Sequence, residues 1–142
     1  MSGKHTLIAI VDTGPLYAAL DRGDDAHEQC AELLQRPDLD LVVPALVIGE
    51  VSFLAASRLG PSVEAAFIRG LASVEVEAPS LEDWPLIAGL IEKYADFPLG
   101  ATDASVAVLA DRLGTDLIVT LDRRHFAALR SVDGKSYRLL PE

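Results

Sequence analysis

Two apolar segments, one near each end of the chain, are each followed directly by an aspartate. Leu7 to Val11 precedes Asp12, and Leu117 to Leu121 precedes Asp122. Short apolar runs of this kind are typical of buried strands in a parallel sheet. Because α/β proteins bind ligands at the carboxyl ends of such strands, we expect the two aspartates to converge on one site if their strands are neighbours.

Strand and helix patterns alternate along the rest of the chain, which predicts a parallel sheet with helices on both faces. The other strands are predicted at 39–43, 73–77 and 137–140. The helices are predicted from Thr13 and at 25–34, 45–59, 62–70, 80–94, 102–113 and 125–129. A chain of 142 residues is long enough for one such domain, over residues 1–142. The predicted fold is therefore a three-layer α/β/α sandwich whose central parallel sheet has about five strands, in the order 3-2-1-4-5.

Two further acids lie within apolar helical segments. Glu50 falls inside the apolar run 45–54, which predicts that its face of the helix is buried, and Asp103 shares a stripe with Val106. The alternatives are a glutamate that reaches solvent from the rim and aspartates that cap helices. Buried carboxylates are costly unless they are paired or bound to metal, and no Lys or Arg shares these stripes. The acids predicted to hold a cation and to be catalytic are Asp12, Glu50, Asp103 and Asp122.

The ligand chemistry of such a site favours Mg²⁺ or Mn²⁺, because these hard cations prefer oxygen donors. His5, His27 and His125 are scattered and lack the spacing of a zinc site, so each is interpreted as a surface or capping residue. The sequence contains no phosphate-binding loop, dinucleotide glycine pattern or nucleophile elbow. The chemistry that remains is hydrolysis of a phosphodiester by metal-bound water.

The formal net charge of −10 argues against a nucleic-acid-binding protein when it is taken alone. Bound metal would neutralise part of the acidic charge, and the distribution of charge matters more than its sum. Arg123 and Arg124 directly follow Asp122, and we predict that they contact the phosphates of RNA. The alternative is that the two arginines belong to a solvated helix start.

Four segments resemble the PIN-domain ribonucleases, and most closely the VapC toxins of bacterial and archaeal toxin–antitoxin pairs. These segments are Asp12–Leu16, Glu50 within its apolar helix, Thr102–Ser105 and Thr120–Phe126. The resemblance covers nearly the whole chain. It implies that the four acids hold one or two Mg²⁺ or Mn²⁺ ions and activate water to cleave RNA. It also implies that hydroxyl groups of Thr13 and Thr120 support the acids.

The same resemblance implies a homodimer and a VapB-like antitoxin that blocks the acidic cleft with a basic side chain. The apolar helical segments 45–59 and 62–71 are predicted to form the groove that receives an antitoxin helix. Transfer RNA and a loop of ribosomal RNA are both plausible substrates. The polar start Met1–His5 and the short apolar runs predict a cytoplasmic protein without a signal peptide or a membrane span.

Three other functions remain alternatives. A PIN-type nuclease of RNA maturation or DNA processing would use the same acids. A haloacid-dehalogenase-like phosphatase would need an aspartate two residues after Asp12, where this chain has Gly14. A receiver-like signalling domain would need a lysine after a late strand, and Asp122-Arg123-Arg124 does not provide one.

Overall fold

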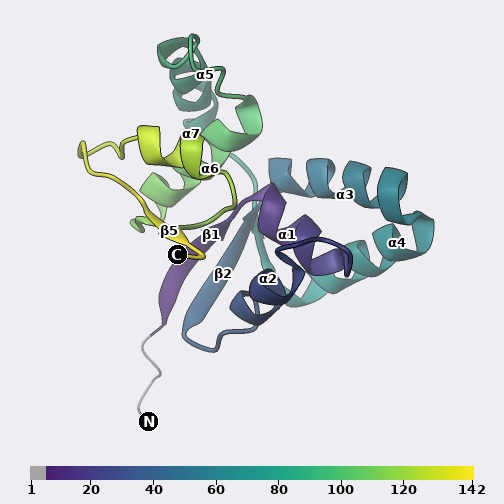
Figure 1. Ribbon diagram of the computed structural model, residues 1–142. Helices are drawn as coiled ribbons and strands as arrows, with labels where there is room; N and C mark the ends of the chain where they lie inside the picture. The colour runs from purple at the N-terminus through teal and green to yellow at the C-terminus, as the bar shows by residue number, and fades with distance from the viewer. Residues whose placement is uncertain (1–5) are drawn as a thin grey trace.

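The computed structural model describes residues 6–142, in which a five-stranded sheet lies between helices (Figure 1). The polar start at residues 1–5, part of the argument against a signal peptide, lies outside this range. Neighbouring strands follow the order β3-β2-β1-β4-β5, and every pair is parallel, so the predicted order is confirmed. The strands are β1 (Leu7–Val11), β2 (Leu39–Pro44), β3 (Glu75–Glu77), β4 (Leu117–Val119) and β5 (Arg138–Leu140).

The helices cover both faces of the sheet and confirm the three-layer prediction. Within residues 6–142 they are α1 (Thr13–Leu20), α2 (His27–Leu33), α3 (Ala45–Leu59), α4 (Pro61–Gly70), α5 (Asp83–Lys93), α6 (Ala101–Arg112) and α7 (Arg123–Ala128), with a 3₁₀ turn, η1 (Leu71–Ser73), after α4. Helix α6 packs on β1, β2 and β4 and is covered by α5, whereas α1, α2 and α4 lie over the other face. Helix α3 contacts both α1 and α6 (Figure 1). No helix in this part of the chain combines the length and apolar character that crossing a membrane requires.

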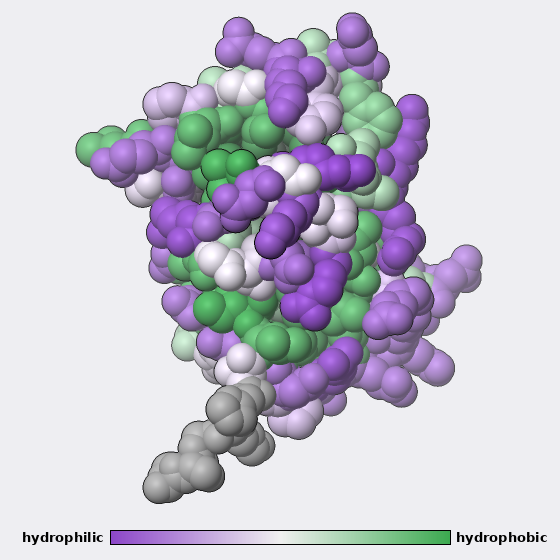
Figure 2. Space-filling view, turned by 90° about the vertical axis from the view of Figure 1, so that its left-hand side faces the viewer, coloured by the Kyte–Doolittle hydropathy of each residue, from purple (hydrophilic) through white to green (hydrophobic). Residues whose placement is uncertain are grey.

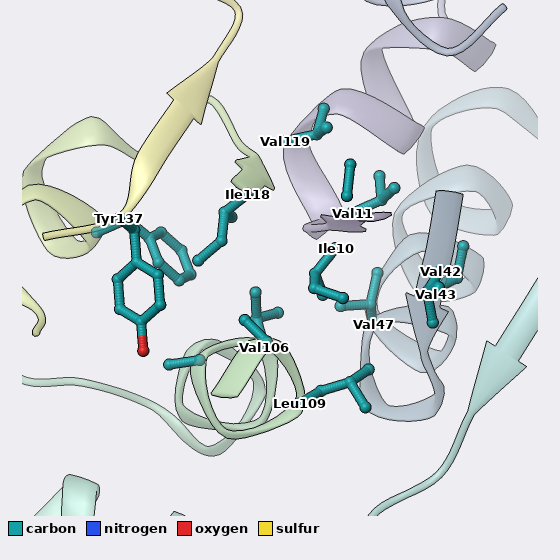
Figure 3. Packing of buried hydrophobic residues seen from close by; sticks show 14 of the residues in the cluster. Ile10, Val11, Val42, Val43, Val47, Val106, Leu109, Ile118, Val119 and Tyr137 are labelled. Atoms are coloured by element: carbon teal, nitrogen blue, oxygen red, sulfur yellow. The ribbon is translucent and has the colours of Figure 1, made fainter. Parts of the chain in front are cut away.

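The core explains why β1 and β4 are neighbours at the centre of the sheet. Ile10 and Ile118 point toward Val106 of α6, whereas Val11 and Val119 point to the opposite side (Figure 3). All five side chains are fully buried. Burial of one such side chain contributes about 1.5–3 kcal/mol, so any other pairing of these strands would be costly. The central strands are therefore held together by apolar packing on both faces.

The register of β1 and β4 places the residues that follow them side by side. Val11 is paired with Val119, and the backbone N–H of Asp12 donates to the carbonyl oxygen of Val119 over 2.9 Å. Asp12 and Thr120 are thus adjacent across the end of the sheet. Strand β4 ends at Val119 rather than at Leu121 as predicted, because the chain turns away after Thr120. This turn carries Asp122 toward the start of α7.

The surface on the side of α5, α7 and β5 is mostly hydrophilic, and separate apolar areas lie between the polar side chains (Figure 2). This mixture agrees with a chain in which 24% of the residues are charged and half are hydrophobic. Charged groups therefore interrupt the apolar side chains that remain on this face.

Candidate active site

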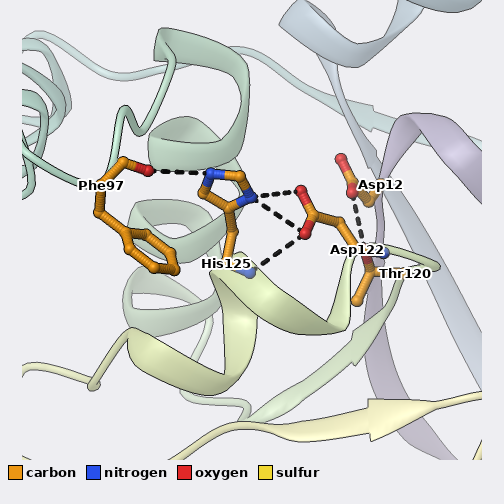
Figure 4. Close-up of polar contacts among 5 residues, drawn as sticks. All are labelled: Asp12, Phe97, Thr120, Asp122 and His125. Atoms are coloured by element: carbon orange, nitrogen blue, oxygen red, sulfur yellow. Dashed lines mark hydrogen bonds and ion pairs between the residues drawn. The ribbon is translucent and has the colours of Figure 1, made fainter.

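Asp12 and Thr120 form the floor of the site at the carboxyl ends of β1 and β4. Asp12 is 5% exposed and Thr120 is fully buried. The Thr120 hydroxyl donates to Oδ2 of Asp12 over 2.8 Å and accepts the backbone N–H of Asp122 over 2.9 Å (Figure 4). One hydroxyl thus fixes the Asp12 carboxylate and the backbone that carries the next acid. This is the position at which the sequence predicted a supporting threonine.

Burial is the main influence on the Asp12 carboxyl and raises its pKa above the ordinary value. The hydrogen bond from Thr120 opposes this shift, whereas the nearby charges of Asp122 and Glu50 add to it. Asp12 therefore sits in a pocket that disfavours its negative charge. A cation bound at this carboxylate would relieve that cost.

Asp122 has a partner that the sequence analysis missed, His125. Nδ1 of His125 lies 2.8 Å and 3.0 Å from the two carboxylate oxygens of Asp122, and Oδ1 of Asp122 also accepts the backbone N–H of His125 (Figure 4). Nε2 of His125 lies 3.1 Å from the carbonyl oxygen of Phe97. Both ring nitrogens face acceptors, a geometry that stabilises the doubly protonated, positively charged ring.

From the sequence, His125 is interpreted as a surface or capping residue; the structure places it in the capped first turn of α7, half-buried, and adds the contact of its ring with Asp122. The hydrogen bond with Asp122 is the main cause that raises the pKa of His125, and burial opposes it. The sequence did hold a signal for this contact, because Asp122 and His125 are three residues apart across a helix start, where a cap and the first turn come together.

Asp103 lies in the first turn of α6 and faces the same cluster. Ligand atoms of Asp103, Asp122 and His125 all lie within 4.8 Å of one another. The pKa of Asp103 is raised to about 6, mainly by burial and also by the charges of Asp12, Asp122 and Glu50, while His125 opposes the rise. All four predicted acids are therefore close enough to act on one another electrostatically.

Glu50 stands at the rim of the site, on α3, and accepts a hydrogen bond of 2.9 Å from the hydroxyl of Thr13. Its predicted burial is wrong, since Glu50 is exposed. The buried side of α3 is instead formed by Val47, Val51 and Ala55, which recur every four residues. Thr13 follows Asp12 directly, so this hydrogen bond ties the rim acid to the end of β1.

The two predicted RNA-binding arginines lie at the start of α7, and both are exposed. Nη1 of Arg123 donates to the carbonyl oxygen of Pro141 over 2.8 Å, which ties α7 to the C-terminal segment. The guanidinium of Arg124 lies over the ring of Phe97, 5.1 Å from its centroid. The two neighbours therefore have different surroundings.

The donor set suits a hard divalent cation. Asp12 and Asp103 both have raised pKa values, and a bound cation would offset the charge that burial and mutual repulsion disfavour. Both nitrogens of His125 are already engaged, which leaves carboxylate oxygens as the available ligands. Oxygen ligands of this kind favour Mg²⁺ or Mn²⁺ over zinc.

Comparisons with known proteins agree with this geometry. The family model of the PIN domain matches residues 9–132. Ribonuclease VapC26 of Mycobacterium tuberculosis is 37% identical over 134 residues, which are 93% of this chain and 99% of that protein.

Solved structures of low sequence identity share the fold. VapC20 of Mycobacterium tuberculosis, described as a sarcin-ricin loop cleaving toxin, aligns with a TM-score of 0.70 at 21% identity, over 78% of this chain and 86% of that one. VapBC2 of Rickettsia felis, bound to a DNA fragment from the promoter, aligns with a TM-score of 0.68 at 15% identity, over 94% and 98% of the two chains.

Proposed function

Because the chain belongs to the VapC family of PIN-domain proteins, we propose that it is a metal-dependent endoribonuclease and the toxin of a toxin–antitoxin pair. The observation that carries this proposal is the convergence of four carboxylates on the end of β1 and β4. Two of them have raised pKa values, as expected of acids arranged to bind a cation.

Each residue of the site has a role in this proposal. Asp12, Asp103 and Asp122 would hold one or two Mg²⁺ or Mn²⁺ ions, with Glu50 closing the rim. A cation held by these acids would supply activation of a water for hydrolysis of a phosphodiester bond. The acids would also position that water, which favours attack in line with the leaving oxygen.

The surrounding hydrogen bonds keep these carboxylates in place. Thr120 fixes Asp12, Thr13 fixes Glu50, and His125 fixes Asp122, with oxygen–oxygen or nitrogen–oxygen distances of 2.8–2.9 Å. Partners of this kind orient metal ligands and limit the motion of an empty site. The site would therefore need little rearrangement when a cation binds.

The proposed substrate is RNA with a single-stranded or looped segment, such as a transfer-RNA anticodon stem or a loop of ribosomal RNA. VapC26 is named a ribonuclease and VapC20 a toxin that cleaves the sarcin-ricin loop, and both share this fold or sequence. Arg123 and Arg124 supply positive charge beside the acids, on a chain that is otherwise acidic.

The experiment that tests the nuclease uses purified, EDTA-treated protein and total RNA. Cleavage should be absent in EDTA and should return with added Mn²⁺ or Mg²⁺, and sequencing of RNA 5′ ends then locates the sites. The same titration followed by thermal unfolding should show that Mn²⁺ raises the melting temperature. Cleavage that is undiminished in EDTA would end the proposal of a metal-dependent enzyme.

The proposed partner is a VapB-like antitoxin that docks on α3 and α4. Phe53 on α3 is 71% exposed and Ile68 on α4 is 46% exposed, so these helices present apolar side chains to solvent. Such side chains are typical anchors for an amphipathic helix of a partner. A basic side chain that follows this helix would then reach the acidic site.

Co-expression tests the toxin role separately from the nuclease. Expression of this chain alone should arrest growth, and expression with the neighbouring antitoxin gene should restore growth and yield a co-purifying complex. Phe53→Ser combined with Ile68→Ser should weaken that complex. Leu81→Ser is the matched control, because Leu81 is 85% exposed and lies before α5. Growth arrest that persists with the partner present would contradict the toxin role.

A further inference from the structure

Phe97 is an aromatic residue that reaches the edge of the acidic site. It lies in the loop between α5 and α6, is partly exposed, and its carbonyl oxygen faces Nε2 of His125 over 3.1 Å. The rings of Phe97 and His125 meet edge to face, with centroids 4.9 Å apart. His125 in turn holds Asp122, so one imidazole ring separates Phe97 from a proposed metal ligand (Figure 4).

Arg124 places a second planar group beside Phe97 at this position. Its guanidinium lies over the Phe97 ring, and the side chain is exposed, so its outer side is open to a ligand. A guanidinium that rests on an aromatic ring keeps its own planar surface available for stacking. Phe126, the other phenylalanine beside His125, is fully buried and cannot contact RNA.

We propose that Phe97 and Arg124 form a stacking platform for one unpaired nucleobase of the RNA substrate. The inference rests on the proposed ribonuclease function and adds a binding subsite to it. The base stacks on the Arg124 guanidinium and on the exposed part of Phe97, while the phosphate of a neighbouring nucleotide lies at the acids. Bases of unpaired RNA are commonly recognised on aromatic and arginine surfaces of this kind.

The charge of the protein explains why such a platform is needed. The net charge of −10 repels RNA, which offsets part of the affinity gained from phosphate contacts at Arg123 and Arg124. Stacking on a π-surface does not depend on phosphate charge, and it selects unpaired over paired RNA because only an unpaired base exposes its face. The platform therefore provides affinity and a preference for loops at the same time.

The contrast with Arg123 sharpens the proposal. Arg123 carries the same charge one residue earlier, but its guanidinium is hydrogen-bonded to the Pro141 carbonyl oxygen. If the two arginines only attracted RNA by their charge, replacing either one should weaken RNA binding by nearly the same amount. If Arg124 stacks on a base, replacing Arg124 should weaken RNA binding far more than replacing Arg123.

Binding of a short, fluorescently labelled single-stranded RNA tests the platform. Asp12→Asn serves as the parent protein, so that the probe is bound in Mg²⁺ without being cleaved. In this parent, Arg124→Ala and Phe97→Leu should each weaken binding roughly 5- to 100-fold, the range expected for loss of one base–side-chain stack. Arg124→Lys should weaken it nearly as much, because lysine keeps the charge and loses the planar group. Arg123→Ala should change the affinity less than about twofold.

Probes with one abasic nucleotide at each position in turn show which base is stacked. One abasic position should weaken binding to the parent and cause a much smaller further loss in Arg124→Ala, where only Phe97 remains to stack. Phe97→Tyr keeps the aromatic ring and should bind RNA like the parent. Melting curves show whether Phe97→Leu is folded.

Any of three results would overturn the platform. The first two are Arg124→Lys that binds like the parent and abasic losses that add fully to the loss caused by Arg124→Ala at every position. Metal-dependent cleavage by the otherwise unchanged protein would then still support the ribonuclease. A parent that binds no RNA in Mg²⁺ would overturn the platform as well, and lack of cleavage would contradict the nuclease itself.

Discussion

Asp12 follows β1 directly and Asp122 lies shortly after the neighbouring strand β4, yet the surroundings of the two carboxylates differ. Asp122 is hydrogen-bonded to the His125 ring and accepts a backbone N–H, so a group that can carry positive charge lies beside it. Asp12 is nearly inaccessible to solvent, and its hydrogen-bond partners among residues 6–142 are neutral: the Thr120 hydroxyl and the backbone of Thr13. Asp103 resembles Asp12, because its pKa is raised to about 6 by burial and by nearby acids.

This difference indicates which part of the site depends on a cation. A buried carboxylate without a countercharge raises the free energy of the folded state, whereas a carboxylate with a hydrogen-bonded cation does not to the same degree. Metal binding should therefore stabilise mainly Asp12 and Asp103. His125 should instead keep Asp122 in its place whether or not a metal is bound.

Asp12→Asn is the substitution expected to have the largest effect. It keeps the volume and the hydrogen-bonding shape while removing one charge from the uncompensated part of the site. Loss of a metal ligand worth several kcal/mol predicts a fall in cleavage rate on the order of 1000-fold. In EDTA the same variant should melt at a higher temperature than the unchanged protein, because carboxylate repulsion is relieved.

Asp25→Asn is the matched control, because Asp25 is exposed and lies before α2, away from the four acids. It should leave both the cleavage rate and the melting temperature nearly unchanged. If Asp12→Asn cleaved RNA at an undiminished rate, Asp12 would not be a ligand and the proposed difference between the two aspartates would be wrong.

The fold could be predicted because its determinants are local and repeated. The apolar runs at β1 and β4 and the alternation of strands with helices depend on side-chain pattern, which a sequence displays directly. The strand order followed once Asp12 and Asp122 were assumed to share a site. The pairing of β1 with β4 confirms this strand order.

The surroundings of the acids were harder to predict because they depend on tertiary contacts. The carbonyl oxygen of Phe97 and the ring of His125 are 28 residues apart, and no periodic pattern connects them. Glu50 was expected to be buried because its segment is apolar all round, but the segment buries only one of its sides. An apolar helical segment predicts that one face of the helix is buried, but tertiary packing decides which face that is.

Two substitutions of His125 separate its contacts, and their effect should be the second largest. Asparagine can place an amide nitrogen near the position of Nδ1 and keep the bond to Asp122, whereas glutamine can reach the Phe97 carbonyl instead. If orientation of Asp122 is what matters, His125→Gln should lose about 10- to 100-fold in Mn²⁺ affinity, as when a partner of a metal ligand is removed. His125→Asn should lose less.

Isothermal titration with Mn²⁺ measures these affinities without relying on cleavage. His125→Ala should resemble the glutamine variant, since both leave Asp122 without its partner. Equal Mn²⁺ affinity in all three variants and in the unchanged protein would show that the His125 contact does not orient Asp122. The proposed difference between Asp122 and Asp12 would then be wrong.

The smallest expected effect is the pH dependence of the metal-free protein. The pKa of Asp103 is raised from 3.8 to about 6 in the folded state, so its contribution to stability is present below pH 4 and is lost as the pH rises through about 6. The raised pKa of His125 acts in the same direction at higher pH, because its contribution declines as the pH rises above 6.5. Unfolding in EDTA should therefore become easier between pH 5 and pH 8, by about 1–2 kcal/mol after allowance for the partial exposure of Asp103.

Thermal unfolding between pH 5 and pH 8, with EDTA or with Mn²⁺, measures this trend. The melting temperature in EDTA should fall by several degrees over this range, while Mn²⁺ should raise it more at pH 8 than at pH 5, because the cation binds ionised carboxylates. Asp103→Asn should reduce the fall in melting temperature near pH 6. The fall at higher pH, which is due to His125, should remain. A melting temperature that rose with pH in EDTA would mean that the charges of Asp12 and Asp103 are already compensated within the protein, and the contrast with Asp122 would disappear.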